Sequence, residues 1–334
     1  MHIHTINLTI LKKIYICIFC FLLQVSVGSA QINPGINVSV NNKKFIGFYN
    51  NLAESYLLNI NRPFIEIQTS SPGKGGYEIN LYPTAGEGYY DVPLISNTGI
   101  SDRLSVVSQI SLYTTAYNLL GNKTNGFGDI YLGLLLNVQS SEKFNHFIQP
   151  GIKIPTSGNK TGSGKVDFHL GASESFETEK FYNTITLNFS LLGRADFPEK
   201  SNRKLPVSII NTIDSLKGTY DYSYEPALDL EINPTYYLND RIQLESGVSY
   251  NRNMKYDFSS LSLFGDVIYN FSNKFYVYPG ADYFKYDKID YYQTSLYAGA
   301  GYNFTDNLSA DISVSDDINH SSKPYFYTQL TFTR

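Results

Sequence analysis

Three histidines beyond the first thirty residues are the side chains that could carry hydrolytic chemistry. A β-barrel hydrolase places a serine nucleophile two residues from its histidine on one strand face, with a polar group to orient the histidine. His169 is followed by Leu170 and Gly171, so the nucleophile position is empty. His146 begins a strand near a turn, which predicts a position at the membrane interface. The strand histidines therefore predict no catalytic site.

Two other patterns resemble functional sequences only superficially. His320 lies close to Asp316, Asp317 and Ser321 in an expected outer loop, where such residues are usually solvated. Residues 157–165, SGNKTGSGK, lack the first glycine and the final serine or threonine that a phosphate loop requires. We predict no catalytic residues, no cofactor and no metal site.

The first thirty residues have the organisation of a secretory signal. Lys12 and Lys13 precede an apolar run over residues 14–27, and small residues follow up to Ala30. A positive segment, an apolar segment and a small-residue cleavage site predict removal after Ala30, with an uncleaved anchor as the alternative.

Both cysteines, Cys17 and Cys20, lie inside this segment. The mature chain is therefore predicted to contain no disulfide and no cysteine-ligated metal. Acidic residues slightly outnumber basic ones, 30 to 26, and no basic run stands out. This charge pattern predicts no nucleic-acid partner.

Charged residues after the signal segment alternate with apolar residues along the predicted strands. A midplane Lys or Arg facing lipid costs about 2–4 kcal/mol, so the charged face is expected to line the lumen. The inward-facing candidates are Gly128, Asp129, Lys153, Lys165, Asp167, His169, Arg194, Asp229, Glu231, Arg241, Glu245, Asp266 and Asp282. They predict a wet channel or a hydrogen-bonded substrate path, with Gly128 and Asp129 as a structured constriction.

Residues 291–304, YYQTSLYAGAGYNF, show the strand pattern most clearly. Apolar residues with aromatics at both ends occupy one face, and polar residues and glycines occupy the other. The segment exceeds the 5–6 residues of an average strand and suits the ~9–11 that cross a bilayer. On its polar face, Gly299 and Gly301 are expected to leave room in the lumen. The same alternation recurs over 103–117, 129–139, 165–173, 184–194, 228–233, 241–251 and 260–271.

Composition and connections support a membrane barrel. The 334 residues include 29 Tyr and 21 Phe, only 17% are charged, and the mean hydropathy is −0.21. Short turns are expected at 101–102, 140–143, 178–180, 239–240, 272–274 and 305–306, and long loops at 119–127, 156–164, 196–220, 253–257, 285–290 and 316–323. Short turns facing the periplasm and long outer loops are typical of outer-membrane barrels.

We predict an all-β, antiparallel, up-and-down transmembrane β-barrel of about fourteen strands, with twelve as the alternative. The first strand comes from Tyr77–Pro83 or Ile60–Thr69. The domains are a signal peptide (1–30), an N-terminal extension or partial plug (31–76) and the barrel (77–334). A soluble sandwich or lipocalin-like barrel is the competing fold, with shorter strands.

The last predicted strand places Phe326, Leu330 and Phe332 on one face. Outer-membrane barrels usually end in such a strand, which the barrel-assembly machinery reads, although here Thr333 and Arg334 follow the final aromatic residue. The expected partners are therefore outer-membrane lipid, the assembly machinery and a small-molecule solute. The expected location is the outer membrane of a Gram-negative cell.

Three short motifs carry a resemblance to a known family: residues 99–104 (GISDRL), 126–130 (GFGDI) and 149–156 (QPGIKIPT). From residue 87 onwards the chain resembles the outer-membrane transporter-like "MetA-pathway of phenol degradation" family, although Ser157 adds one residue before the motif's closing glycine. The resemblance implies an outer-membrane barrel that passes small, often hydrophobic or aromatic molecules, and it implies no catalytic residues. The alternative is a structural or surface-interaction barrel that acts through its outer loops.

Overall fold

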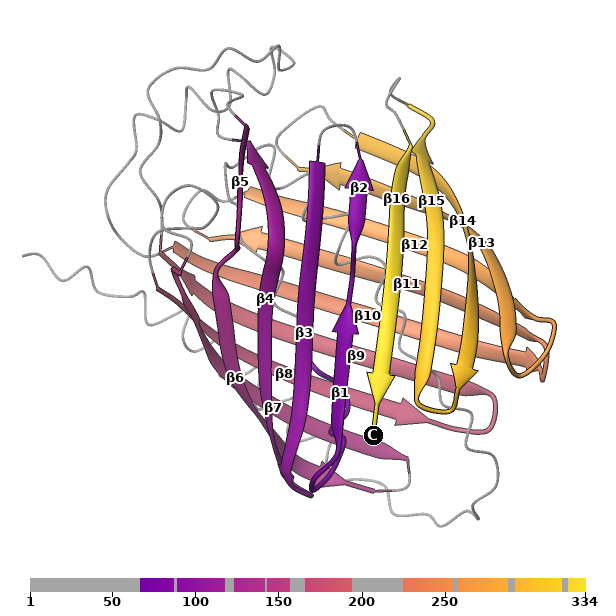
Figure 1. Cartoon of the computed structure of the whole chain (residues 1–334), viewed down its shortest axis with the longest axis horizontal. Coiled ribbons are helices and arrows are strands. Elements are labelled where there is room, and N and C mark those ends of the chain that lie inside the picture. Colours follow the sequence, from indigo (N-terminus) through magenta and orange to yellow (C-terminus); the bar gives the residue numbers. More distant parts are fainter. Residues whose placement is uncertain are drawn as a thin grey trace, which may run out of the picture. The chain divides into compact units, whose positions relative to one another are not determined.

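The computed structural model describes residues 67–86, 89–117, 123–141, 143–156, 166–193, 225–254, 258–287, 292–319 and 324–334. All regular elements in these ranges are β-strands (Figure 1). No helix among the described residues is long and apolar enough to cross a membrane.

The strands follow one another along the chain with short turns or longer connections between them. They are β1 (Tyr77–Leu81), β2 (Thr84–Gly86), β3 (Tyr89–Ser101), β4 (Leu104–Tyr117), β5 (Lys123–Gly126), β6 (Ile130–Ser140), β7 (Phe144–Ile154), β8 (Asp167–Glu177), β9 (Phe181–Leu192), β10 (Glu225–Asn239), β11 (Ile242–Asn253), β12 (Phe258–Asn270), β13 (Phe275–Tyr286), β14 (Tyr292–Thr305), β15 (Leu308–Asp317) and β16 (Tyr325–Thr333).

Two of the barrel's strands are interrupted. β1 and β2 both pair with β3 on one side and β16 on the other, so together they form one strand broken at Tyr82 and Pro83. β5 and β6 both pair with β4 and form a second broken strand. The sixteen segments therefore make fourteen antiparallel strands, closed by the β1–β16 pairing. The predicted fold is confirmed, with Tyr77 beginning the first strand, and the twelve-strand alternative is wrong.

The described turns all lie at the barrel end that carries both termini of the barrel. Tyr77 N–H donates to the Arg334 carbonyl at 2.9 Å, which places the start of β1 beside the end of β16. In an up-and-down barrel the turns after β3, β6, β8, β10, β12 and β14 share that end, and all are short as predicted. One expected loop is corrected, because residues 123–126 of the 119–127 loop pair with β4 as strand β5.

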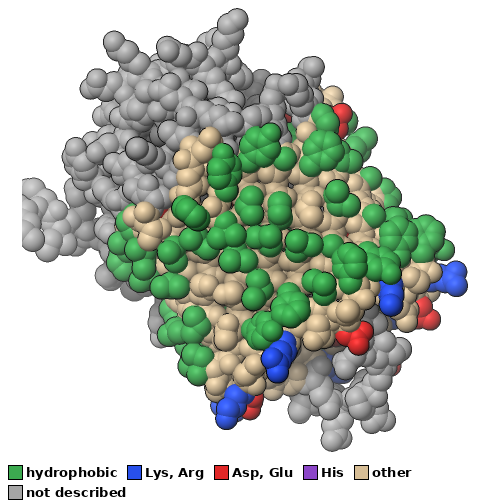
Figure 2. Space-filling view, viewed as in Figure 1, with side chains coloured by type: hydrophobic (Ala, Val, Ile, Leu, Met, Phe, Trp, Pro, Cys, Tyr) green, Lys and Arg blue, Asp and Glu red, His purple; other side chains and the backbone are tan. Residues whose placement is uncertain are grey.

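Side chains separate cleanly onto two faces. On β6, Leu132, Leu134 and Leu136 are exposed while Tyr131 and Leu135 are buried. Figure 2 shows hydrophobic side chains spread across the outer face of the strands, with charged side chains towards its margin. Inward-facing polar residues such as Ser173 are buried. An apolar exterior around a polar interior reverses the arrangement of a soluble protein, and it identifies a barrel that spans a membrane.

The glycines of β14 do not leave the room that was expected on the lumen side. Gly299 lies opposite Tyr278, and Gly301 lies opposite Tyr276, on the neighbouring strand β13. A Cβ at either glycine would overlap the facing tyrosine ring. The expected space is therefore filled by rings, because a glycine across an antiparallel pair is where a large neighbour can lie flat on the backbone.

Substituting Gly299 with alanine is expected to destabilise the barrel by about 1–3 kcal/mol, since the buried Tyr278 ring must move to admit the methyl group. Urea unfolding of the refolded protein in detergent measures the change. Gly265→Ala on β12 is the matched control, because the atom nearest to its added Cβ lies at 3.8 Å. Equal stability of the two variants would contradict this packing.

Candidate functional site

Most of the predicted lumen residues face inward. Gly128, Asp129, Lys153, Asp167, His169 and Asp266 are buried, and Asp229, Glu231, Glu245 and Asp282 are half-buried on the inward-facing positions of their strands. Three predicted residues have other outcomes. Lys165 and Arg194 lie outside the described residues. Arg241 is exposed in the turn between β10 and β11, where its N–H donates to Asn239 Oδ1 at 2.9 Å, so it does not line a strand face.

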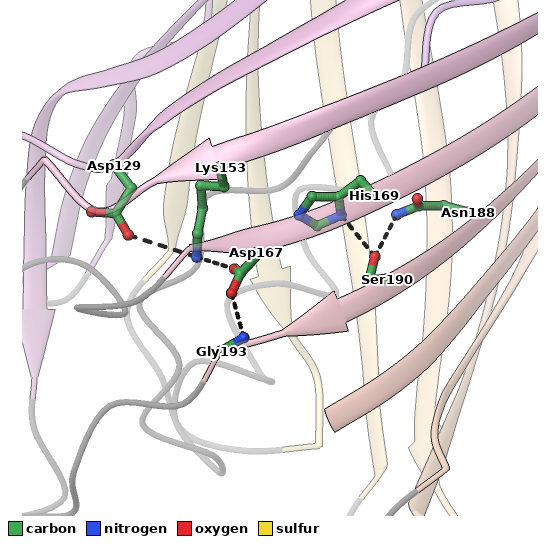
Figure 3. Close-up of polar contacts among 7 residues, drawn as sticks. All are labelled: Asp129, Lys153, Asp167, His169, Asn188, Ser190 and Gly193. Atoms are coloured by element: carbon green, nitrogen blue, oxygen red, sulfur yellow. Dashed lines mark hydrogen bonds and ion pairs between the residues drawn. The ribbon is translucent and has the colours of Figure 1, made fainter. Parts of the chain in front are cut away.

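The deepest charged group is a lysine held between two aspartates (Figure 3). Lys153 Nζ lies 3.6 Å from Asp129 Oδ2 and forms a closer ion pair with Asp167. All three side chains are 0–1% exposed. Lys153 and Asp167 are direct partners across β7 and β8, and Asp129 comes from the break between β5 and β6. Charges this deeply buried are tolerated because each one has an opposite partner.

Hydrogen bonds at and beside this ion cluster hold several strand ends together, at the places where the chain leaves the wall to form connections. Asp167 also accepts a hydrogen bond from Gly193 N–H at 2.6 Å, just beyond the end of β9. Gly128 N–H donates to the Ser111 carbonyl, and its own carbonyl accepts from Thr156 Oγ1 beyond the end of β7. Gly128 and Asp129 are thus held by several contacts, and the structured constriction expected at these two residues stays a prediction.

A histidine and a serine meet on the inner wall (Figure 3). His169 Nδ1 lies 2.7 Å from Ser190 Oγ, and the two residues are direct partners across β8 and β9. Asn188 Nδ2 donates to the same serine oxygen at 3.2 Å. In a catalytic triad the third group orients the histidine, whereas here the asparagine contacts the serine. The contact therefore does not reproduce triad geometry.

The sequence pattern did not indicate this contact, because a nucleophile was expected on the histidine's own strand. The cross-strand partner of an inward-facing residue depends on the register between two strands. That register is set by the length of the turn and by the need to keep the apolar side chains of both strands on the same face. The four-residue spacing from Glu177 to Phe181 brings Ser190 opposite His169. A register count from that turn is the signal that could have found it.

Tyrosine hydroxyls and carboxylates form a second polar group on the opposite part of the wall. Tyr276 donates to Asp311 at 2.7 Å, and Tyr278 donates to the same carboxylate. Tyr297 donates to Asp266 at 3.1 Å. Each of these rings passes over a glycine of the adjacent strand and reaches a carboxylate one strand further on. The tyrosines therefore hold carboxylates in place without neutralising them.

The inner wall is strongly acidic as a whole. Lys153 is the one inward-facing Lys or Arg among the strand side chains that the structure describes, and it is already paired with two aspartates. The other inward-facing acidic side chains include Glu78, Asp91, Glu177, Asp229, Glu231, Glu245, Asp266, Asp282, Asp311 and Asp317. They lie mainly on β10 to β15. Within the described ranges these residues do not gather into a set of three or more that could hold a metal ion.

No family model and no curated protein matches this chain, so the family resemblance indicated by the three motifs stays a prediction. Solved structures that it resembles include the toluene transporter TodX of Pseudomonas putida, at 9% identity and a TM-score of 0.42, covering 79% of this chain and 91% of that one.

Two other similar structures are outer-membrane proteins. The outer-membrane channel DcaP of Acinetobacter baumannii matches at 7% identity and a TM-score of 0.39, covering 81% of this chain and 100% of that one. A bacterial polysaccharide outer-membrane secretin matches at 11% identity and a TM-score of 0.46, covering 77% and 98%. At such low similarity, the assignment rests on the closed fourteen-stranded wall and its apolar exterior. By this architecture the chain is an outer-membrane β-barrel.

Proposed function

We propose that this protein is a passive channel for small solutes across the outer membrane, and that cationic solutes pass more readily than anions. The observation that supports the proposal is the charge of the inner wall. Its described carboxylates greatly outnumber its described cations, and the one inward-facing lysine among the described strand residues is paired with Asp129 and Asp167. Low-dielectric walls focus the field of such charges into the lumen, which concentrates cations there.

Aromatic solutes are included in the proposed class. The family resemblance implies small hydrophobic or aromatic molecules, and the inner wall carries tyrosine rings such as Tyr276 and Tyr297 that lie flat over glycines. A ring held flat against the wall is suited to contact an organic cation through its face. The acidic, tyrosine-rich wall therefore favours aromatic or quaternary ammonium ions over neutral hydrophobic molecules.

A selectivity measurement tests the proposed function. In planar bilayers with a potassium chloride gradient, the refolded barrel is expected to give a reversal potential with the same sign as the equilibrium potential of potassium. Neutralising two half-buried inward carboxylates, Glu245→Gln and Asp282→Asn, is expected to move the reversal potential towards zero, because the lumen field weakens.

The control for this measurement is Asp306→Asn, which removes an exposed charge in the β14–β15 turn and should leave selectivity unchanged. A preference for chloride, or no effect of the two inward substitutions, would contradict the proposed cation selectivity. A barrel that stays impermeable to both ions would favour the alternative of a surface-interaction protein that acts through its outer loops.

A further inference from the structure

Residues 67–76, called the strap here, cross the inner face of the barrel wall before entering β1. Gln68 N–H donates to Gln149 Oε1 on β7 at 2.9 Å, and the Gln68 carbonyl accepts from Ser173 Oγ on β8 at 2.7 Å. Further along, Ser71 Oγ lies 2.6 Å from Ser105 Oγ on β4. These contacts come from inward-facing residues, so the strap lies inside the barrel.

The strap continues across β3 and ends beside β1. Asn97 Nδ2 donates to the Ser70 carbonyl at 3.0 Å, and Gly75 N–H donates to the Gly99 carbonyl at 2.9 Å. In the sheet the order of these strands is β3, β4, β6, β7 and β8. The strap thus runs across five successive strand segments of the wall, rather than along one of them.

The wall is shaped to receive the strap at both ends. Ile67 is 5% exposed and packs with Val107, Tyr131, Leu135 and Phe147 in one apolar cluster. A Cβ on Gly171 would meet the end of the Ile67 side chain, and a Cβ on Gly99 would overlap the Gly73 backbone. Gly73 itself has a φ of 74°, which favours glycine where the strap turns. The glycines therefore let the strap backbone and the Ile67 side chain lie directly on the wall.

We propose that the inner face of β3, β4, β6, β7 and β8 is a docking surface for an extended peptide, and that the strap is its occupant. Docking of the strap narrows the lumen and so gates conduction. This inference rests on the proposed channel function. The contacts shown for the strap are side-chain hydrogen bonds, one apolar anchor and a short backbone pairing of Gly75 and Gly76 with Gly99, and they do not make a continuous strand ladder along the wall. Such a segment opens at a lower free-energy cost than the surrounding wall does.

A reversible lock tests the gate. Ser71→Cys with Ser105→Cys joins the strap to β4 where the two hydroxyls now touch. Ser96→Cys with Ser108→Cys is the matched control, because these outward-facing hydroxyls of β3 and β4 lie 2.7 Å apart and do not contact the strap. Cys17 and Cys20 precede the predicted cleavage site, so the mature variants should carry only the introduced pair.

Bilayer conductance of the strap pair is expected to be low when oxidised and to rise severalfold after addition of dithiothreitol, while the control pair conducts equally in both states. A second variant, Gly171→Leu, places a side chain where Ile67 of the strap contacts the wall. Because the strap can then no longer dock there, conductance should be raised without reductant. Gly265→Leu on the outer face of β12 is its control.

The outcomes separate the two proposals. Thiol alkylation followed by mass measurement reports whether the Ser71–Ser105 replacement pair forms a disulfide, which tests docking whether or not the barrel conducts. A formed disulfide with equal conductance in both redox states, and an unchanged Gly171→Leu variant, would overturn the gate and leave the channel. If no variant conducts, the channel function fails and the gate fails with it.

Discussion

Replacing Lys153 with methionine is expected to destabilise the barrel by about 3–5 kcal/mol, the usual cost of removing one partner from a buried ion pair. Methionine replaces the apolar stem of the lysine side chain but leaves Asp129 and Asp167 facing each other without their cation. Both carboxylates are 0–1% exposed, so little water can replace the ammonium group. The midpoint of urea unfolding in detergent, or the temperature at which the barrel loses its compact gel mobility, measures the loss.

The matched control removes all the charges together. Asp129→Asn and Asp167→Asn combined with Lys153→Met should recover much of the lost stability, because no uncompensated charge remains. An unfolding midpoint of Lys153→Met equal to that of the wild type would mean that the cluster is solvated and does not secure the strand ends.

Replacing Leu134 with arginine is expected to cost about 2–4 kcal/mol, the penalty for arginine on the lipid face at the bilayer midplane. Leu134 is 46% exposed near the middle of β6, between Leu132 and Leu136 on the outer face. Reversible unfolding in lipid vesicles gives the free-energy difference directly. The result tests whether this face contacts hydrocarbon, which no conductance measurement does.

The control for that substitution is Gln139→Arg on the same strand. Gln139 is exposed next to the short β6–β7 turn, where an added charge can reach water and should cost only about 0–1 kcal/mol. Similar penalties at both positions would contradict the placement of the bilayer across the middle of β6.

Alternation along the chain was sufficient to predict the strands and their faces. A period of two is a local property, so Leu132, Leu134 and Leu136 could be assigned to the lipid face without knowing any neighbour. Turn and loop lengths are also local, and together with an even strand number they predicted fourteen strands. The inward position of Asp167, Asp229, Glu231, Glu245, Asp266 and Asp282 followed from the same alternation, whereas Arg241, expected on the same face, lies in a turn.

Contacts between strands were not accessible in this way. The pairing of His169 with Ser190, and of Lys153 with Asp167, depends on strand register, which a search within each strand does not use. The same limit explains why Gly299 was expected to leave open space. Its side of the wall is filled by Tyr278 from another strand, and only the register places that ring there.

The sequence by itself determined the strand periodicity, the lipid-facing and inward-facing sides, and the end of the barrel that carries the short turns. The tertiary structure alone decided which inward side chains meet and which two strands are interrupted, one as β1 and β2 and the other as β5 and β6. It also decided how residues 67–76 run along the inner face of the wall. The physical reason is that strand faces follow from the backbone's own two-residue repeat, whereas lumen contacts follow from closure of the whole sheet.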